Sequence, residues 1–192
     1  SRGLDLNDLL YQAQETFARI HEHASRFSDT LDSSNAKLRE FTSESKQTGA
    51  IRRMDELNTE SEGFLRATQE IANSSKTAFQ ELQENLSSFD RLDAQAKRSL
   101  VQKYAAQAAQ LKEKAAVFHD ATRHLEAEQQ YLSRKADQLD DYDMGAGDDL
   151  RAIAKSITAA SFQADDVATS TRYAHEWIDR LAPQDRNNLL NF

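Results

Sequence analysis

Apolar side chains recur at alternating intervals of four and three residues along the first part of the chain, an average repeat of about 3.5. Because positions three and four residues apart lie on the same face of an α-helix, this spacing gathers them on one stripe. The stripe comprises Leu6, Leu10, Ala13, Phe17, Ile20, Ala24, Phe27, Leu31, Ser34, Leu38, Phe41 and Ser45. A helix with one apolar stripe is stable mainly when the stripe packs against other helices, so this segment predicts a helical bundle or a coiled coil.

The same spacing continues over the rest of the chain and is interrupted only where residues favour a turn. The first break is at Thr48-Gly49, since glycine readily adopts the backbone conformation that ends a helix. The strongest break covers residues 144–149, which include two glycines and two aspartates suited to capping, and Pro183 marks the last break. A capping-box spacing over 87–90 is a weaker signal, so residues 50–143 form one helix or two, and we favour two.

These features predict an all-α protein, an elongated antiparallel bundle of about four long amphipathic helices with coiled-coil-like packing. The predicted helices cover roughly residues 5–47, 50–87, 90–143 and 149–181, and a polar tail covers 183–192. We expect a single helical-bundle domain over residues 1–192. The chain has one proline and five glycines, too few for the many tight turns of a sandwich or a barrel.

The charge of the chain is acidic, with a formal net charge of −8. Most of this charge comes from six aspartates between positions 137 and 149, a stretch that contains no lysine or arginine. The rest of the chain is close to balanced, so we predict no nucleic-acid partner.

Targeting and redox features are few. The absence of cysteine excludes disulfides, thiolate metal sites and cysteine nucleophiles. No stretch approaches the roughly 20 apolar residues of a membrane span, so a soluble chain is expected, although its compartment stays unknown. The chain begins Ser-Arg-Gly without a methionine, so a fragment of a larger membrane protein is one alternative that the sequence leaves open.

Two groups of residues suggest metal sites, but their spacing is unfavourable. His21 and His23 are two residues apart, and His119 and His124 are five apart, so neither pair shares a helix face as zinc or di-iron ligands do. The aspartates from 137 to 149 partly match a calcium loop, but the glycine is one position early and no glutamate ends the loop. A solvated turn whose acids favour the next helix dipole is the simpler interpretation, and we predict no metal ligand.

Catalytic signatures are likewise missing from the sequence. It contains no nucleophile-elbow motif, no phosphate-binding glycine loop and no dinucleotide-binding glycine motif. We therefore predict that the chain is not an enzyme, with no catalytic residues, no cofactor-binding residues and no cofactor.

Polar residues on the apolar stripes are the most informative remaining feature. Polar side chains at such positions reduce stability and often select helix register or partner number. They could also line a small pocket for a small-molecule ligand between helices. These positions are Ser34, Ser45, Ser61, Thr68, Ser75, Thr122, Gln129 and Thr171.

The leading functional hypothesis is a non-enzymatic helical-bundle or coiled-coil module for protein–protein interaction or structural scaffolding. Long apolar stripes, charged outer faces and the absence of site chemistry all favour it. Any exposed part of a stripe would be covered by a helix of a partner protein or by self-association.

Three other hypotheses stay open, two of them on architectural similarity. The chain is similar to the ligand-binding regions of bacterial chemoreceptors, which implies an extracytoplasmic ligand-sensing bundle. It is also similar to the BAR domains, which implies a membrane-associated dimer with a basic face. The residues that would form that face, with acids interspersed, are Arg91, Lys97, Arg98, Lys103, Lys112 and Lys114. A secreted bacterial virulence factor with coiled-coil domains also fits the composition.

Overall fold

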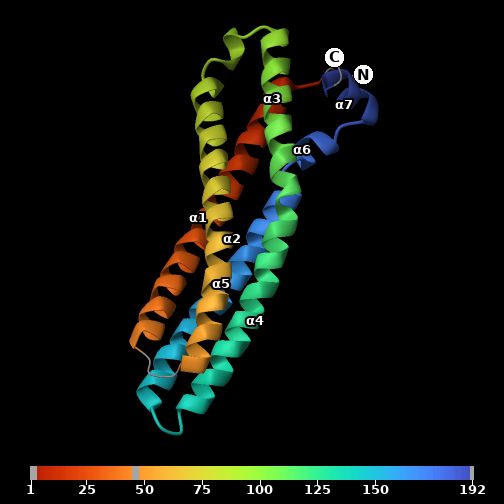
Figure 1. Ribbon diagram of the computed structural model, residues 1–192. Helices are drawn as coiled ribbons and strands as arrows, with labels where there is room; N and C mark the ends of the chain where they lie inside the picture. Colours follow the sequence, from red (N-terminus) through yellow and green to blue (C-terminus); the bar gives the residue numbers. More distant parts are fainter. Residues whose placement is uncertain (1–3, 45–47, 191–192) are drawn as a thin grey trace. The chain divides into compact units, whose positions relative to one another are not determined.

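The computed structural model describes residues 4–44 and 48–190, and within this part of the chain it consists of helices joined by short turns, without strands (Figure 1). The all-α prediction is confirmed. The elements are α1 (Leu6–Glu44), α2 (Thr48–Leu86), the 3₁₀ helix η1 (Phe89–Arg91), α3 (Ala94–Glu113), α4 (Ala115–Leu139), α5 (Met144–Arg172), α6 (Glu176–Asp179) and α7 (Pro183–Leu190). Ser45, the predicted helix end at 45–47 and the last residues of the predicted tail, 191–192, lie outside the described residues.

The predicted helix over 90–143 is wrong, because the structure divides this segment into η1, α3 and α4. A turn follows Leu86, and the helix cap is Asp93 rather than the predicted 87–90 box: Asp93 Oδ1 accepts a hydrogen bond from Ala96 N at 2.8 Å. α3 and α4 are separated only by Lys114, whose backbone N–H donates to Leu111 O. Neither glycine nor proline lies near this break, and nothing in the sequence explains it.

The predicted helix start at 149 is also wrong, because α5 begins at Met144 and both glycines of the supposed break lie within its first turn. The cause is the cap: Asp143 Oδ1 accepts a hydrogen bond from Ala146 N at 3.0 Å and so satisfies an otherwise unpaired N–H of the first turn. At the other end, α5 stops at Arg172 and a separate short helix, α6, precedes Pro183.

The predicted polar tail at 183–192 is helical over most of its length, since α7 covers Pro183–Leu190. Proline suits the first position of a helix, where its missing N–H would have no intrahelical partner. Leu189 is buried, and its carbonyl accepts a hydrogen bond from Gln102 Nε2 at 2.8 Å. The helix is therefore held by packing against α3 as well as by its own backbone.

The chain groups into two compact units. Unit 1 contains residues 1–22, 71–115 and 169–192, and unit 2 contains residues 23–70 and 116–168. The prediction of a single domain over 1–192 stays a prediction, because α1, α2 and α5 each contribute residues to both units.

Aromatic side chains form much of the core of unit 1. Phe17 of α1 meets Tyr104 of α3 edge to face, with ring centroids 6.0 Å apart, and both side chains are fully buried. The Tyr104 hydroxyl donates to Glu81 Oε2 of α2 at 3.0 Å, which satisfies its polar end. Trp177 of α6 also lies in this core, and its Nε1 donates a hydrogen bond to Ala174 O at 2.9 Å.

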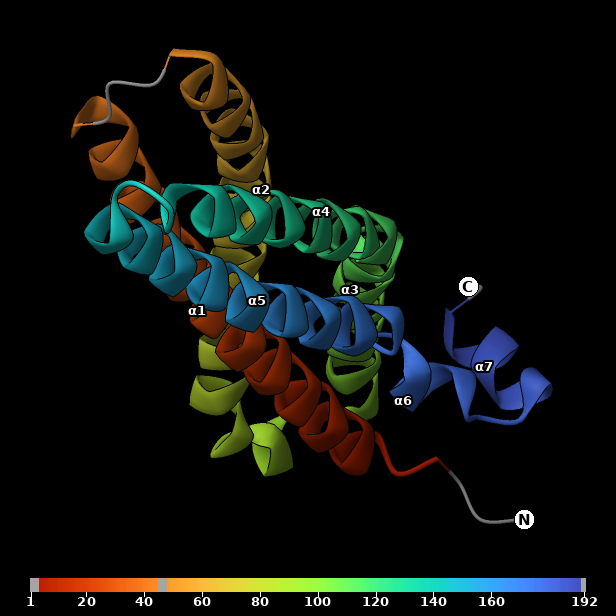
Figure 2. The same cartoon turned by 90° about the horizontal axis from the view of Figure 1, so that it is seen from below.

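In unit 2, segments of α1, α2, α4 and α5 pack together, and α4 and α5 run side by side in both views (Figure 1, Figure 2). Phe27 of α1 meets Phe118 of α4 at a centroid distance of 6.3 Å in the apolar core. Ser34 of α1 hydrogen-bonds Ser156 of α5, so α1 also contacts α5. The chain reverses direction between α4 and α5 (Figure 2), whereas an exact four-helix antiparallel bundle for the whole chain stays a prediction.

Candidate functional site

The most unusual residue of unit 2 is Glu128, which lies on the apolar face of α4. This face carries Phe118, Ala121, Leu125, Leu132 and Ala136, all fully buried like Glu128 itself. Among the described residues, Glu128 is the one carboxylic acid buried in this way. An ionised carboxylate is expensive to bury without a partner, so this position calls for a specific explanation.

The sequence reasoning missed Glu128 because it followed a strict heptad, which placed Thr122 and Gln129 on the stripe. The buried residues of α4 also repeat every seven residues, but the intermediate position of each heptad comes three residues after Phe118 or Leu125 and not four. The buried intermediate positions are therefore Ala121 and Glu128, one residue before the predicted ones. Gln129 instead donates from Nε2 to Ser133 Oγ at 3.0 Å on a partly exposed surface.

The surroundings of Glu128 favour its neutral form. Its Oε2 accepts one hydrogen bond, from Ser61 Oγ of α2 at 3.2 Å, and its Oε1 has no hydrogen-bond partner among the described residues. Burial raises the pKa of the Glu128 carboxyl to about 8; the Ser61 hydrogen bond lowers this pKa, and the negative charge of Glu60 raises it. Glu128 therefore carries its proton at neutral pH.

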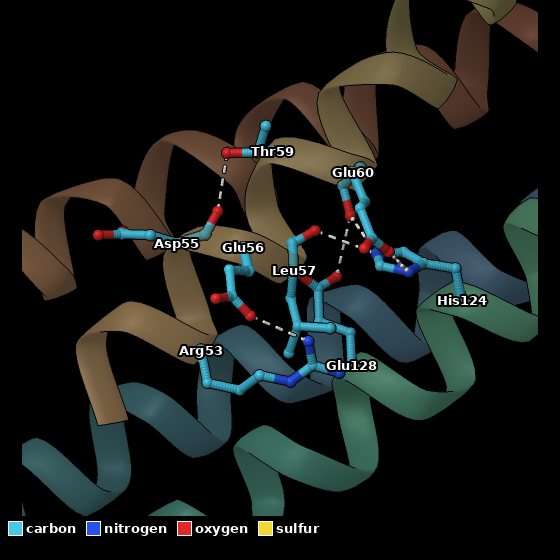
Figure 3. A network of polar contacts seen from close by, with 9 residues as sticks. Arg53, Asp55, Glu56, Leu57, Thr59, Glu60, His124 and Glu128 are labelled. Carbon is cyan, nitrogen blue, oxygen red and sulfur yellow. Dashed lines mark hydrogen bonds and ion pairs between the residues drawn. The ribbon is translucent and has the colours of Figure 1, made fainter. Parts of the chain in front are cut away.

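His124 lies one helical turn before Glu128 and joins α4 to α2 (Figure 3). Its Nδ1 is 2.8 Å from Glu60 Oε2, and its Nε2 is 3.0 Å from Leu57 O and 3.2 Å from Ser61 Oγ. Both ring nitrogens of His124 thus face oxygen atoms of α2. The His124 side chain is only 11% exposed, whereas Glu60 is 61% exposed at the edge of the contact between α2 and α4.

Two further polar side chains, Asn35 of α1 and Asn58 of α2, are buried in unit 2. Asn58 Nδ2 makes a long hydrogen bond, 3.4 Å, to the backbone oxygen of Asn35. Both amide atoms of Asn35 and the Asn58 Oδ1 have no partner among the described residues. Each unpaired buried atom costs on the order of 1–3 kcal/mol.

The order Glu60, His124, Ser61 resembles the carboxylate, imidazole and hydroxyl of a nucleophilic relay. Two contacts and the burial of Ser61 oppose that chemistry. The His124 Nε2 faces the Leu57 carbonyl, the Ser61 hydroxyl donates to Glu128, and Ser61 is fully buried away from any substrate. In this conformation the contacts bind α4 to α2 and do not activate a nucleophile, while the absence of enzymatic activity stays a prediction.

A groove of about 350 Å³ lies between α1 and α5 in unit 2. Its apolar lining residues are Phe41, Ala152 and Ile153. Four charged residues, three acids and one base, line the same groove: Lys37, Glu40, Glu44 and Asp149. We call these seven residues the end groove. Phe41 also lines a smaller hollow beside Leu139 and Tyr142, so apolar surface extends from the groove towards the α4–α5 turn.

A second, shallow hollow follows the outer face of α2. It is lined by Ile51, Arg52, Asp55, Glu56, Thr59 and Glu60, all from one helix. Arg53 Nη1 and Glu56 Oε2 form an ion pair at 3.3 Å beside it (Figure 3). A surface formed by a single helix with mixed charges offers little enclosure for a ligand.

The aspartate-rich turn between α4 and α5 carries its own cation, Arg151. The Arg151 guanidinium lies 2.6 Å from Asp140 Oδ2 and 3.2 Å from both Asp137 Oδ1 and Asp148 Oδ1. Asp143 caps α5, as described above. The structure thus agrees with a solvated capping turn at the supposed calcium loop.

Three of the five histidines, His21, His124 and His175, make polar contacts within the protein. His21 Nδ1 lies 3.0 Å from Ala72 O, and His175 Nδ1 lies 3.1 Å from Asp179 Oδ1. Within residues 4–44 and 48–190, no group of three or more histidine, aspartate or glutamate side chains is placed to hold a metal ion.

The basic residues suggested as a membrane-binding face lie in unit 1, on η1, on α3 and at Lys114. Two of them are engaged by acids: Lys103 Nζ lies 3.2 Å from Glu81 Oε2, and Lys112 Nζ lies 3.6 Å from Asp179 Oδ2. These pairs reduce the positive charge available to an anionic surface. None of the described helices combines the length and the apolar character that crossing a membrane requires.

Comparison with known proteins gives no relative: no family model, no curated protein and no solved structure matches this chain significantly.

Proposed function

We propose that the chain is a non-enzymatic helical module for protein–protein interaction, and that the end groove receives an amphipathic segment of a partner with basic residues beside its apolar face. The observation that carries this proposal is that one groove is lined both by the apolar residues Phe41, Ala152 and Ile153 and by acids.

The groove is suited to a few side chains of a helix. A hollow of about 350 Å³ is at the small end of the range for binding pockets, which is enough for one or two apolar anchors. An amphipathic helix typically inserts such anchors at positions i and i+3 or i+4 into an apolar groove. The groove lies between two helices, which is the geometry that this mode of recognition uses.

Charge determines the kind of segment. Glu40, Glu44 and Asp149 are exposed beside the groove, and only Lys37 opposes them. Lysines or arginines flanking the apolar face of the partner would meet complementary charge, which increases the rate of association and selects against acidic segments.

Exposed apolar residues near the groove support the same proposal. Tyr142 and Met144, at the α4–α5 turn, are 65% and 68% exposed. Tyr142 belongs to the hollow that shares Phe41 with the end groove, so a partner helix longer than the groove could extend onto this surface. Large exposed apolar side chains that gather near one hollow are typical of interaction sites.

Binding of a designed peptide tests the proposal. The probe is a fluorescent helical peptide of about 15 residues with leucines on one face and lysines flanking them, and a scrambled peptide of equal composition is the control. Fluorescence anisotropy should show tighter binding of the amphipathic peptide. Ala152→Arg, which puts a large, positively charged side chain in the groove lining, should weaken binding about tenfold or more. Glu44→Lys should weaken it about two- to fivefold in a salt-dependent way.

The matched control variant is Ala127→Arg, which places the same side chain on the exposed surface of α4 outside the groove. It should bind like the unaltered chain. Equal affinity for the amphipathic and scrambled peptides, or equal loss in Ala127→Arg and Ala152→Arg, would show that the groove is not the binding site.

A ligand-sensing helical bundle is the second candidate, favoured by the unpaired amide atoms of Asn35 and Asn58. A small polar molecule that satisfied these atoms would bind the folded state and raise its melting temperature. A thermal-shift screen with amino acids and small amides, repeated with Asn35→Leu, tests it: stabilisation that persists in the variant would contradict this site.

A further inference from the structure

We infer that unit 2 contains a proton-operated switch, in which protonated Glu128 keeps α2 and α4 packed together and loss of the Glu128 proton separates them. This inference is independent of partner binding at the end groove, because it rests on the contacts between α2 and α4, which we call the α2–α4 seam.

The first argument is the geometry around the carboxyl group. A carboxylate can accept about four hydrogen bonds, and in water it has all of them. In unit 2, Glu128 has one donor, Ser61 Oγ at 3.2 Å, while Oε1 has no partner among the described residues and the side chain is fully buried. The packed seam therefore accommodates the neutral acid far better than the anion.

The second argument is the set of charged groups around the seam. From α2, Glu60 contributes negative charge that opposes ionisation of Glu128. On α4, His124 lies one helical turn before Glu128, and its Nδ1 is 2.8 Å from Glu60 Oε2. On α1, Arg39 pairs with Glu62 of α2 at the surface.

The inward-facing residues of α1 and α5 add no compensating charge. On α1 the buried residues of unit 2 are Ala24, Phe27, Leu31, Ser34, Asn35, Leu38 and Thr42, and on α5 they are Leu150, Ile153, Ala154, Ile157, Ala160, Ser161, Ala164, Val167 and Ala168. None of these side chains is ionisable. The pKa of Glu128, raised to about 8, agrees with surroundings that supply negative but no positive charge. Glu128 therefore ionises under mildly alkaline conditions.

The third argument is that hydration between α2 and α4 can reduce the free-energy cost of ionising Glu128. Water that entered between α2 and α4 would hydrate the Glu128 carboxylate, and it would replace the contacts of His124 with Leu57 O and Ser61 Oγ. These hydrogen bonds are only partly buried and Glu60 beside them is 61% exposed, so we expect water to enter between α2 and α4 at this point. Ionisation of a buried carboxyl group is commonly relieved by such local opening and hydration.

The test measures the α2–α4 distance as a function of pH in the full chain. Because the chain contains no cysteine, Thr59→Cys and Ala127→Cys place one spin label on an exposed position of each helix. Pulsed electron paramagnetic resonance should show one distance at pH 6 and a longer one at pH 9. With a pKa of about 8, the ionised fraction rises from about 1% to about 90% between these pH values.

Glu128→Gln keeps the shape of the side chain but cannot ionise, so in this variant the distance should be the same at pH 6 and pH 9. Glu126→Gln changes an exposed glutamate of the same helix and should leave the transition unaltered. A pH-independent distance in the unaltered chain, or a transition that survives in Glu128→Gln, would overturn the inference. Carbon-13 NMR of the Glu128 carboxyl gives a second measurement: titration near 4.5 would overturn the inference, and titration near 8 supports it.

Discussion

Replacing Glu128 with glutamine should make the protein less sensitive to alkaline pH. The amide keeps an oxygen that can accept the Ser61 hydrogen bond, but it has no proton to lose. In the unaltered chain the pKa of Glu128 is about 8 when folded, against an ordinary value of 4.5. Because the folded-state pKa is raised, the folded protein holds a proton that the unfolded protein has released between these two pH values. The contribution of this group to stability is complete below pH 4.5 and is lost as pH rises through 8.

The size of the effect follows from the pKa difference. Each unit of pKa corresponds to about 1.4 kcal/mol, so the full loss is about 5 kcal/mol, of which about 3 kcal/mol has occurred by pH 7. The glutamine variant does not have this loss. The difference in unfolding free energy between Glu128→Gln and the unaltered chain should therefore increase by about 2.5 kcal/mol in favour of the variant from pH 5 to pH 7.

Urea unfolding followed by far-ultraviolet circular dichroism, at half-unit steps from pH 5 to 8.5, measures this difference. Glu126→Gln is the matched control and should follow the unaltered chain at every pH. If the stability curves of Glu128→Gln and the unaltered chain ran parallel over this range, the carboxyl group would titrate alike in both states, and the reasoning from its burial would be refuted.

Three further predictions concern single packing and polar contacts, each measured as the unfolding free energy in urea. Gly147→Ala should destabilise the protein by about 1–3 kcal/mol, because the added methyl group would overlap Asp140 Oδ1 and come within 3.0 Å of the Ala136 carbonyl oxygen; an unchanged value would mean that the turn relaxes freely. Asn35→Leu should stabilise it by about 1–3 kcal/mol, since it removes two unpaired buried atoms, and a loss of stability would show that the amide is satisfied in solution. His124→Leu should lower the unfolding free energy by about 1–3 kcal/mol. Glu60→Gln should lower it by less than about 1 kcal/mol, because Glu60 is largely exposed; equal losses in the two variants would contradict the conclusion that the buried side chain, His124, contributes more than its exposed partner.

The apolar pattern predicted the helices well because burial along a helix is periodic. Leu10, Phe17, Phe27 and Leu38, all on the predicted stripe of the first helix, are fully buried in α1. The pattern did not predict where helices begin and end within an uninterrupted stripe. The separation of α3 from α4 at Lys114 involves no glycine, proline or capping residue that a sequence pattern could detect.

The candidate site was harder to predict than the fold. A search for apolar periodicity treats a glutamate as a surface residue, so Glu128 was not considered, although it lies three residues after Leu125 and four before Leu132. Ser61 was recognised as a polar residue on the stripe, but its role depends on α4, which is 67 residues away in the sequence. The chemistry of Glu128 comes from neighbours that only the tertiary structure brings together.

The position of Arg151 has a consequence for how the α4–α5 turn behaves in different media. A mobile counterion leaves when the solution is dilute or contains a chelator, whereas a guanidinium attached to the backbone stays at a fixed effective concentration. The turn should therefore keep its shape in buffers with and without divalent cations, and concentrated salt, which screens exposed pairs, should be the condition that loosens it.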